Sequence, residues 1–301
     1  MNPFIKKNIS VELRPDTLQS TYTEIRYKKL DIEVLKFNDG SLRVTLPEMS
    51  LELEQRYCTI TAFVENMDDI MIIAQIKDII ERLSKSPKMF TLALTSTSYT
   101  RYDRVMFENK TDSFGAKVFA DAVNNLNFDF VQLFDCHSEV MLDLINKSIN
   151  IDQNTLLQDT LYCFNDFIGD YNIVAPDKGA TKKLTDPNMI FDKVRNVETG
   201  QITGMEIIHD ESDVSKEYLV IDDICEGGRT FIELAKLFKE VKGKETQINL
   251  YVTHGIFSNN AVEKLLDFYS KIYVNFMKES DYDKLTDSQQ DNVFVNTLIN
   301  A

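Results

Sequence analysis

The sequence alternates short, continuous apolar runs with longer stretches of helical periodicity. The apolar runs span residues 90–97, 128–135, 171–176, 218–223 and 247–255. The amphipathic stretches that precede or follow them span residues 68–84, 114–126 and 230–241. Strands buried on both faces are written as continuous apolar runs, and alternation with amphipathic helices is typical of parallel sheets covered by helices. The pattern predicts an α/β fold with doubly wound parallel sheets.

The length of 301 residues, 43% of them hydrophobic, is sufficient for two cores of ordinary size. The polar stretch around residues 146–157 separates the apolar runs into two halves, so we expect domains at residues 1–150 and 151–301. The last residues are candidates for packing back on the N-terminal domain.

Composition excludes several classes of protein. A formal net charge of −15 repels polyanions and argues against a nucleic-acid partner. The four cysteines are scattered without a C-x-x-C pair, so neither a disulfide framework nor a zinc site is indicated. The apolar runs are too short to cross a bilayer, and the first ten residues, MNPFIKKNIS, lack the apolar core of a secretory signal. We therefore expect a soluble cytoplasmic protein without a membrane partner.

Two adjacent carboxylates end the apolar run 218–223, directly before a glycine pair. Asp222 and Asp223 are followed by Gly227 and Gly228 at the start of a predicted helix. Backbone N–H groups at a helix N-terminus bind anions, and neighbouring carboxylates accept hydrogen bonds from vicinal hydroxyls or hold magnesium. A ribose phosphate presents both kinds of group. A helix-capping turn is the alternative interpretation of these residues when they are taken alone.

Lysines and arginines gather in two other segments, DKGATKK (177–183) and DKVRN (192–196). Because the chain is acidic overall, any phosphate ligand would have to be bound by such local clusters of cations. Lys193 and Arg195 are two residues apart, so both would point to the same side of an extended loop and could close over phosphoryl oxygens. A solvated basic loop is the alternative.

Six segments, in this order, carry a resemblance to a known family. They are KFNDGS (36–41), SYTRYDR (98–104), FDCH (134–137), APDKGATKK (175–183), FDKVRN (191–196) and THGIFS (253–258). Together with the DD…GG segment, they resemble the motifs of the ribose-phosphate pyrophosphokinase (phosphoribosyl diphosphate synthetase) family. The resemblance is collinear from about residue 37 to residue 257.

The resemblance implies two domains of phosphoribosyltransferase type and transfer of the β,γ-diphosphoryl group of Mg-ATP to the anomeric hydroxyl of ribose 5-phosphate, with release of AMP. The implied ATP-binding residues are Phe37, Asp39, Arg101, Tyr102, Asp103 and Arg104. His137 and Asp177 are the implied Mg²⁺ residues, and Lys193 and Arg195 the implied catalytic cations. The implied ribose-phosphate loop consists of Asp222, Asp223, Glu226, Gly227, Gly228, Arg229 and Thr230.

The chain departs from the family pattern in its substrate segments. Ser41 replaces the usual glutamate and Tyr102 the usual glutamine, so the nucleotide preference stays open. In the ribose-phosphate loop, Gly227 lacks the family's hydroxyl and Arg229 adds a guanidinium. Arg229 either binds a second phosphate of the acceptor or pairs with a carboxylate such as Glu226. A second phosphate is present in ADP-ribose, which would connect the reaction with NAD metabolism. The acceptor is therefore ribose 5-phosphate or ADP-ribose.

Two other functions remain open. A phosphoribosyltransferase shares the DD loop but does not need an ATP segment, and a regulatory homologue would bind nucleotide without turnover. The family also implies a homodimer or larger homo-oligomer, in which Phe37 and Asp39 reach a neighbouring subunit. His254, at the end of a predicted strand, is assigned a structural role.

Overall fold

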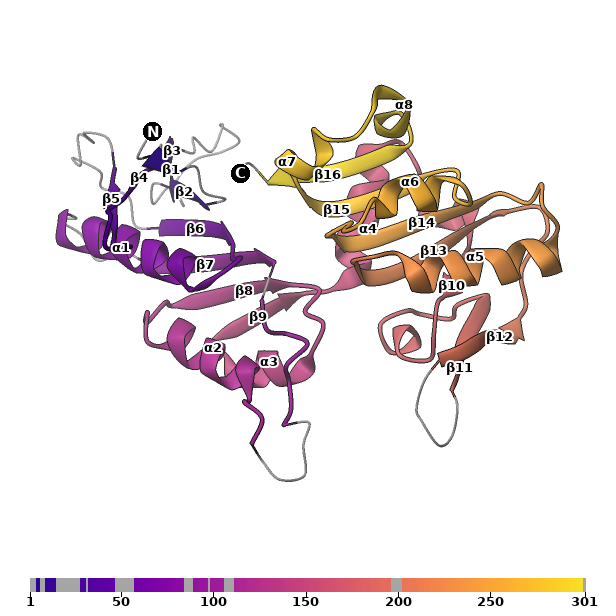
Figure 1. The fold of residues 1–301 in the computed structure, drawn as a ribbon, viewed down its shortest axis with the longest axis horizontal. Helices are drawn as coiled ribbons and strands as arrows, with labels where there is room; N and C mark the ends of the chain where they lie inside the picture. Colours follow the sequence, from indigo (N-terminus) through magenta and orange to yellow (C-terminus); the bar gives the residue numbers. More distant parts are fainter. Residues whose placement is uncertain are drawn as a thin grey trace, which may run out of the picture. The chain divides into compact units, whose positions relative to one another are not determined.

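The computed structural model describes residues 4–5, 9–14, 28–30, 32–46, 57–83, 89–96, 98–105, 111–195 and 202–299. The chain divides into two compact units, one of residues 1–151 with 300–301 and one of residues 152–299. The boundary expected from the sequence, after residue 150, lies one residue before this division. Figure 1 colours the two units along the chain, from indigo at the N-terminus to yellow at the C-terminus.

The N-terminal unit is built on a six-stranded sheet with the order β3-β2-β6-β7-β8-β9. Its strands are β2 (Ile9–Arg14), β3 (Lys28–Leu30), β6 (Tyr57–Phe63), β7 (Met89–Ser96), β8 (Phe130–Phe134) and β9 (Ser148–Ile151). The strands from β6 to β9 are parallel, whereas β2 is antiparallel to both of its neighbours. A second, three-stranded antiparallel sheet contains β1 (Phe4–Ile5), β4 (Glu33–Lys36) and β5 (Leu42–Thr45).

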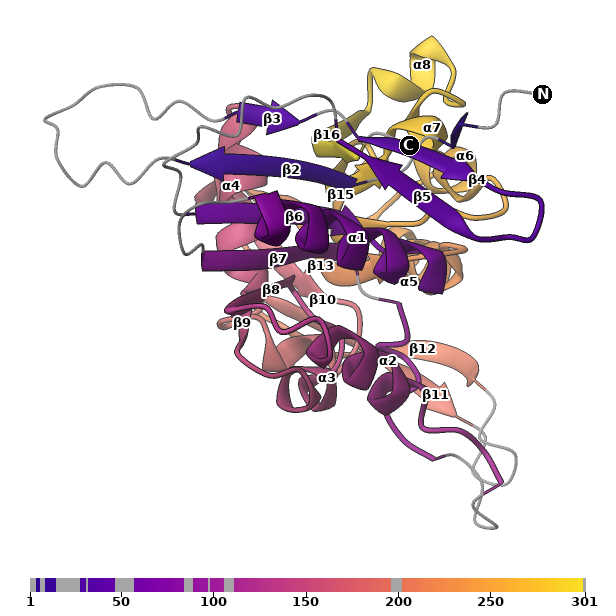
Figure 2. The ribbon, with the colours of Figure 1, turned by 90° about the vertical axis from the view of Figure 1, so that its left-hand side faces the viewer.

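Three helices cover the larger sheet: α1 (Met67–Leu83), α2 (Gly115–Asn124) and α3 (Glu139–Leu144). Ile72, Ile76 and Ile80 recur at helical spacing on α1 and are fully buried in the same core as Ile60 of β6. In the turned view of Figure 2, α1 lies across β6 and β7. The parallel strands β6, β7 and β8 are thus each followed by a helix that buries its apolar face on the sheet.

The C-terminal unit contains a seven-stranded sheet with the order β12-β11-β10-β13-β14-β15-β16. Its strands are β10 (Tyr171–Ala175), β11 (Met189–Arg195), β12 (Ile202–Asp210), β13 (Glu217–Cys225), β14 (Ile248–Gly255), β15 (Ile272–Lys278) and β16 (Val293–Ile299). All neighbouring strands are parallel except β11 and β12, which form an antiparallel pair.

Helices pack on both faces of the C-terminal sheet. One face carries α4 (Gln153–Cys163), and the other carries α5 (Arg229–Lys242) and α6 (Ala261–Leu266). The short α7 (Glu279–Tyr282) and α8 (Asp287–Gln290) lie between β15 and β16, and two 3-10 turns span Ile168–Asp170 (η1) and Ala180–Lys182 (η2). Side chains such as Leu219 and Val220 alternate between the two cores, which explains the continuous apolar run in this strand. The predicted α/β class with helices on both sheet faces is confirmed.

Two details differ from the sequence-based expectation. Asp222 and Asp223 do not emerge from the end of their strand, because β13 continues to Cys225 and Asp222 pairs with Val252 of β14. The segment expected as an extended loop, 191–196, is the strand β11 up to Arg195. Its pairing with β12 shifts register between Val194 and Arg195, so simple alternation of side chains does not hold there.

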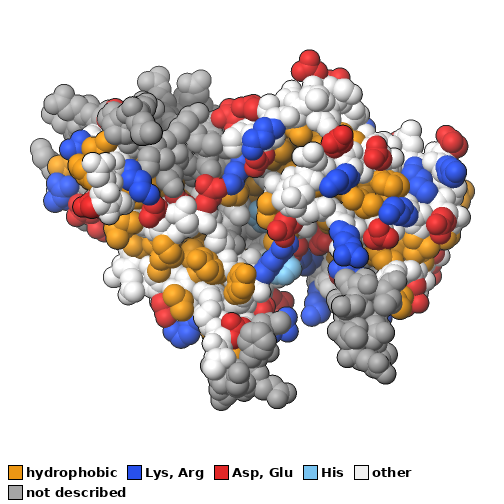
Figure 3. Space-filling view, viewed as in Figure 1, with side chains coloured by type: hydrophobic (Ala, Val, Ile, Leu, Met, Phe, Trp, Pro, Cys, Tyr) orange, Lys and Arg blue, Asp and Glu red, His pale blue; other side chains and the backbone are white. Residues whose placement is uncertain are grey.

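The last two residues, 300–301, lie outside the described part of the chain, so the packing of the chain end on the N-terminal domain stays a prediction. Among the described residues, no helix is both long and apolar enough to cross a membrane. Acidic and basic side chains are interspersed on the face of the C-terminal unit that Figure 3 shows. That face carries no broad basic area.

Candidate functional site

Three neighbouring parallel strands of the C-terminal sheet end at the same edge. β10 lies between β11 and β13, and their pairing aligns Ala175 with Ile190 and Val174 with Val220. Asp177 follows β10, Lys193 lies near the end of β11, and Asp222 lies near the end of β13. Ligand sites in open α/β sheets form at the carboxyl ends of the strands, which is where these three side chains meet.

Asp177 and Lys193 form an ion pair across this edge. Lys193 Nζ donates to Asp177 Oδ2 at 2.6 Å, and the N–H of Ala180 donates to Asp177 Oδ1 at 3.1 Å. Burial raises the pKa of Asp177, but the hydrogen bond and charge of Lys193, with the backbone N–H groups of Gly179 and Ala180, outweigh it. The pKa of Asp177 is held below its ordinary value, so its carboxylate is ionised.

Asp222 and Asp223 have different environments although they are adjacent. Lys183 Nζ lies 2.9 Å from Asp223 Oδ2 and neutralises that carboxylate. Asp222 Oδ1 accepts the N–H of Asp223 at 2.9 Å. Burial, and then the charge of Asp223, raise the pKa of Asp222 to about 7, and the charges of Asp177 and Lys193 also act on it. The site therefore holds Asp177, whose carboxylate is ionised, and Asp222, whose carboxyl group titrates near neutral pH.

The loop after β13 leads into the N-terminus of α5. Gly228 is the N-cap of α5 and has a φ of 73°, the left-handed region that favours glycine. Glu226, Gly227 and Arg229 are exposed and Thr230 is half-buried. The first N–H groups of a helix lack partners within the helix, and here they face a loop that carries little side-chain bulk. The loop is suited to an anion.

The strand β11 contributes a second ion pair beside the first. Lys178 Nζ lies 2.5 Å from Asp192 Oδ2, and the lysine is exposed. The side chain of Arg195, the second predicted catalytic cation, lies outside the described part of the chain. The structure therefore places Lys193 in the site and leaves the role of Arg195 a prediction.

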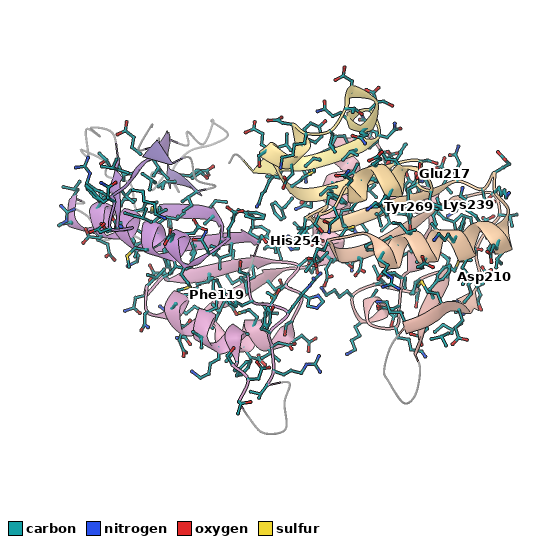
Figure 4. The ribbon with its side chains drawn as sticks, viewed as in Figure 1. Phe119, Asp210, Glu217, Lys239, His254 and Tyr269 are labelled. Carbon is teal, nitrogen blue, oxygen red and sulfur yellow. The ribbon has the colours of Figure 1, made fainter. Side chains whose placement is uncertain are left out.

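His254 lies at the same end of the sheet, as expected for a strand-end residue. It belongs to β14, and its ring stacks on Phe276 of β15 with centroids 5.8 Å apart and planes 18° apart. Figure 4 shows His254 at this edge and Glu217, at the start of β13, towards the opposite edge.

In the N-terminal unit, the segment 98–105 packs on the start of α2. Tyr99 stacks on Phe119 with centroids 5.6 Å apart, and the carbonyl of Tyr102 accepts the N–H of Ala116 at 3.0 Å. The Tyr102 side chain is 63% exposed, and Arg101 is also exposed. A flat ring and a guanidinium are therefore presented to solvent on a fixed backbone.

Asp103 links this segment to the predicted metal segment. Its Oδ2 accepts from Ser138 Oγ at 2.9 Å, and its Oδ1 lies 3.3 Å from Arg104 Nε. Ser138 directly follows His137, which is exposed just beyond the end of β8. The structure thus brings Asp103, Arg104 and the His137 segment together at one edge of the N-terminal sheet.

The hairpin between β4 and β5 carries the remaining two predicted ATP residues. Phe37 is 45% exposed, and Asp39 accepts from the N–H and the Oγ of Ser41 at 2.9 and 2.7 Å. The hydrogen bonds from Ser41 lower the pKa of Asp39. Ser41, a departure from the family pattern, therefore fixes the carboxylate of the turn.

Sequence reasoning gave no role to Lys183, which pairs with Asp223. The basic segment DKGATKK indicated that a lysine here could bind an acidic group. Which of its three lysines does so depends on the turn η2 after β10, which the sequence did not predict. Within the part of the chain that the structure describes, no three His, Cys, Asp or Glu side chains come together as a metal site.

Comparisons with known proteins place these motifs in context. No family model matches the chain. A ribose-phosphate pyrophosphokinase of Pyrococcus abyssi is 25% identical over 263 residues, covering 85% of this chain and 87% of the relative. The protein of that name from Mycoplasma genitalium is 25% identical over 271 residues, covering 85% and 78%. The one from Cereibacter sphaeroides is 24% identical over 245 residues, covering 78% and 70%.

A solved structure has the same fold. The crystal structure of phosphoribosylpyrophosphate synthetase from Mycobacterium smegmatis matches with a TM-score of 0.62 and 19% sequence identity, covering 88% of this chain and 85% of that chain. This similarity confirms the fold class.

Proposed function

We propose that this chain, a divergent relative of the ribose-phosphate pyrophosphokinases, transfers the β,γ-diphosphoryl group of Mg-ATP to the anomeric hydroxyl of a ribose 5-phosphate compound. The observation that carries the proposal is the meeting of Asp177, Lys193 and Asp222 at the ends of three adjacent strands, beside the Gly228 loop. Anion-binding amides, sugar-binding carboxylates and a mobile cation are the parts that this transfer needs.

The sugar is held by the loop and by the paired aspartates. Backbone N–H groups at the start of α5 bind the 5-phosphate, and the carboxylates of Asp222 and Asp223 accept hydrogen bonds from ribose hydroxyls. Lys183 holds the Asp223 carboxylate in place by its 2.9 Å contact. The anomeric oxygen is thereby directed away from the phosphate loop.

The transfer forms a bond from the C1 oxygen of ribose to the β-phosphorus of ATP and breaks the bond from that phosphorus to the α,β-bridging oxygen. AMP leaves, and the C1 hydroxyl loses its proton. Lys193 leaves its ion pair with Asp177 and binds the oxygens of the transferred phosphoryl group, where it neutralises their charge. Arg195 is proposed to bind the same oxygens. Arg101, Tyr102, Asp103, Arg104, Phe37 and Asp39 are proposed to bind ATP.

Magnesium is proposed to enter with ATP. The ionised carboxylate of Asp177 is a hard oxygen ligand, and Mg²⁺ takes most of its ligands from phosphates and water when proteins bind it through one or two carboxylates. The candidate site, with Asp177 as its carboxylate ligand, is consistent with this mode of Mg²⁺ coordination. The ion would neutralise charge on the phosphates, and His137 is the second residue that the family resemblance assigns to Mg²⁺.

The acceptor is ribose 5-phosphate or a compound in which that phosphate continues, such as ADP-ribose. The exposed Arg229 beside the loop supports the second form, which would place the reaction in NAD-related metabolism. The exposed Phe37 at the tip of the β4–β5 hairpin supports a homo-oligomer in which this hairpin contacts the ATP bound to a second copy of the chain. The proposed location of the enzyme is the cytoplasm.

The test is to incubate the protein with Mg-ATP and each acceptor separately and to separate the nucleotides by chromatography. The proposal predicts acceptor-dependent AMP with an equal amount of a new sugar diphosphate. A phosphoribosyltransferase would form neither, and a non-catalytic homologue would leave ATP intact. ADP as the nucleotide product, or no product with either acceptor, would contradict the proposal.

A further inference from the structure

A pocket of about 580 Å³ lies at the carboxyl ends of β14 and β15, outside the residues assigned above. This volume is within the range of small-molecule sites, about 300–1,000 Å³. Its walls come from the segment after β14, from α6 and from the α7–α8 region. The residues that line it include Ser258, Asn259, Glu263, Lys284, Leu285 and Gln289.

One wall of the pocket is also the support of the ribose-phosphate loop. The carbonyl of Cys225 accepts the N–H groups of Ile256 and Phe257 at 2.9 and 3.2 Å. A side chain placed on Gly227 would meet Ser258 Oγ at 3.9 Å. Ser258 therefore stands between the loop and the pocket, and a ligand whose phosphate lies against Gly227 reaches the pocket by passing it.

The lining combines apolar surface with amide and hydroxyl groups. Ile256, Phe257 and Leu285 supply apolar area, while Ser258, Asn259 and Gln289 supply donors and acceptors. The flat faces of a nucleobase are apolar and its edges form hydrogen bonds, so this mixture fits a base.

The charges of the pocket do not favour a free anion. Lys284 Nζ lies 2.7 Å from Asp281 Oδ1, so the lysine that lines the pocket is already paired. Glu263, on α6, adds a negative charge at the rim. A neutral heterocycle is therefore a better occupant than an isolated phosphate.

We infer that this pocket binds the nucleoside end of an extended acceptor, in which the phosphate of ribose 5-phosphate continues as a diphosphate into a nucleoside. The inference rests on the proposed function, because it places the ribose phosphate on the Gly227–Gly228 loop. According to this inference, Ser258 and the pocket make the protein bind an extended acceptor more tightly than ribose 5-phosphate.

The inference is tested by calorimetric titration of the full chain with ADP-ribose and, separately, with ribose 5-phosphate. We expect ADP-ribose to bind at least about tenfold more tightly. Glu263→Trp places a bulky ring in the pocket from an exposed position and should bring the ratio of the two affinities to within about twofold. Glu240→Trp, an exposed glutamate of α5 outside the pocket, is the matched control and should keep the ratio.

Lys284→Trp gives the same test from the opposite wall if the first variant does not fold. Equal affinities for the two ligands in the unmodified protein would overturn the inference, as would a ratio that Glu263→Trp and Lys284→Trp leave intact. These binding results are independent of catalysis. Loss of AMP formation with both acceptors would refute the diphosphoryl transfer while the calorimetric ratio still decides the pocket.

Discussion

Lys193 is the residue whose contacts bear most directly on the proposed chemistry. Its side chain is only 20% exposed and its ammonium group is bound to Asp177, so the cation lies at the candidate site without any ligand. Asp222, in the same electrostatic neighbourhood, is the carboxyl group with the raised pKa. Perturbed groups that gather at strand ends are typical of functional sites.

Replacing Lys193 with alanine removes the cation that is proposed to stabilise the transition state. We expect Lys193→Ala to lower kcat by about 10²-fold or more with a smaller change in the KM for ATP, because the contact forms chiefly in the transition state. Steady-state AMP release measures both constants. Lys178→Ala, which removes an exposed lysine from the neighbouring ion pair, is the control. An unchanged kcat in Lys193→Ala would refute the assigned role.

The raised pKa of Asp222 makes a prediction about stability. Its folded-state pKa of about 7 exceeds the ordinary value of 3.8, so between these values the native state binds more protons than the unfolded state. The contribution of Asp222 to the free energy of unfolding is therefore largest at low pH and is lost as the pH rises through about 7.

Asp222→Asn mimics the protonated form at every pH. The free energy of unfolding of this variant minus that of the unmodified protein should rise from pH 5 to about pH 7 and level off at higher pH, as measured by urea denaturation. Asp267→Asn, at an exposed position, controls for the loss of one carboxylate. A difference that stays flat for Asp222→Asn would show that this carboxyl group is not the titrating one.

Among the elements, the end of β14 shows how closely the backbone of the site is packed. A side chain on Gly255 would lie 2.3 Å from Phe257 Cε2 and 2.8 Å from Val274 Cγ1. Phe257 has a φ of 45°, so the chain turns back sharply after the strand. This turn gives the Cys225 carbonyl its two donors and so fixes the loop that follows β13.

Gly255→Ala should therefore destabilise the C-terminal unit by about 1–3 kcal/mol, the usual cost of overpacking. Gly204→Ala, in β12 of the same sheet, is the matched control, since nothing lies within 4 Å of the added carbon. Urea denaturation compares the two variants. Equal stability of Gly255→Ala and the unmodified protein would mean that the strand end is not constrained in this way.

Sequence patterns predicted the buried strands and long helices well, because the spacing of apolar residues in these elements follows which side chains are buried. The run ending at Asp223 and the helix around 230–241 correspond to β13 and α5 (Arg229–Lys242). The hairpin of β11 and β12 was not predicted, because an edge pair with exposed residues such as Val194 lacks a continuous apolar run. The pairing of Lys183 with Asp223 joins side chains 40 residues apart and could come only from the folded sheet.

As a whole, the molecule is an acidic chain with two separately cored units, each carrying a group of predicted substrate residues at the ends of its strands. Because the chain has a net charge of −15, the proposed phosphate ligands would have to be bound by a few local cations rather than by an overall positive field. The proposed division of work gives the adenosine end of ATP to the N-terminal unit and the sugar phosphate to the C-terminal unit.

The fate of the γ-phosphate of ATP tests the central claim most directly. The protein is incubated with magnesium, ribose 5-phosphate or ADP-ribose, and ATP that carries a radioactive γ-phosphate, and the products are separated by chromatography. The account predicts that the label moves intact into the sugar product while unlabelled AMP appears in equal amount. Label recovered as orthophosphate beside ADP, or label that remains in ATP with both acceptors, would contradict it.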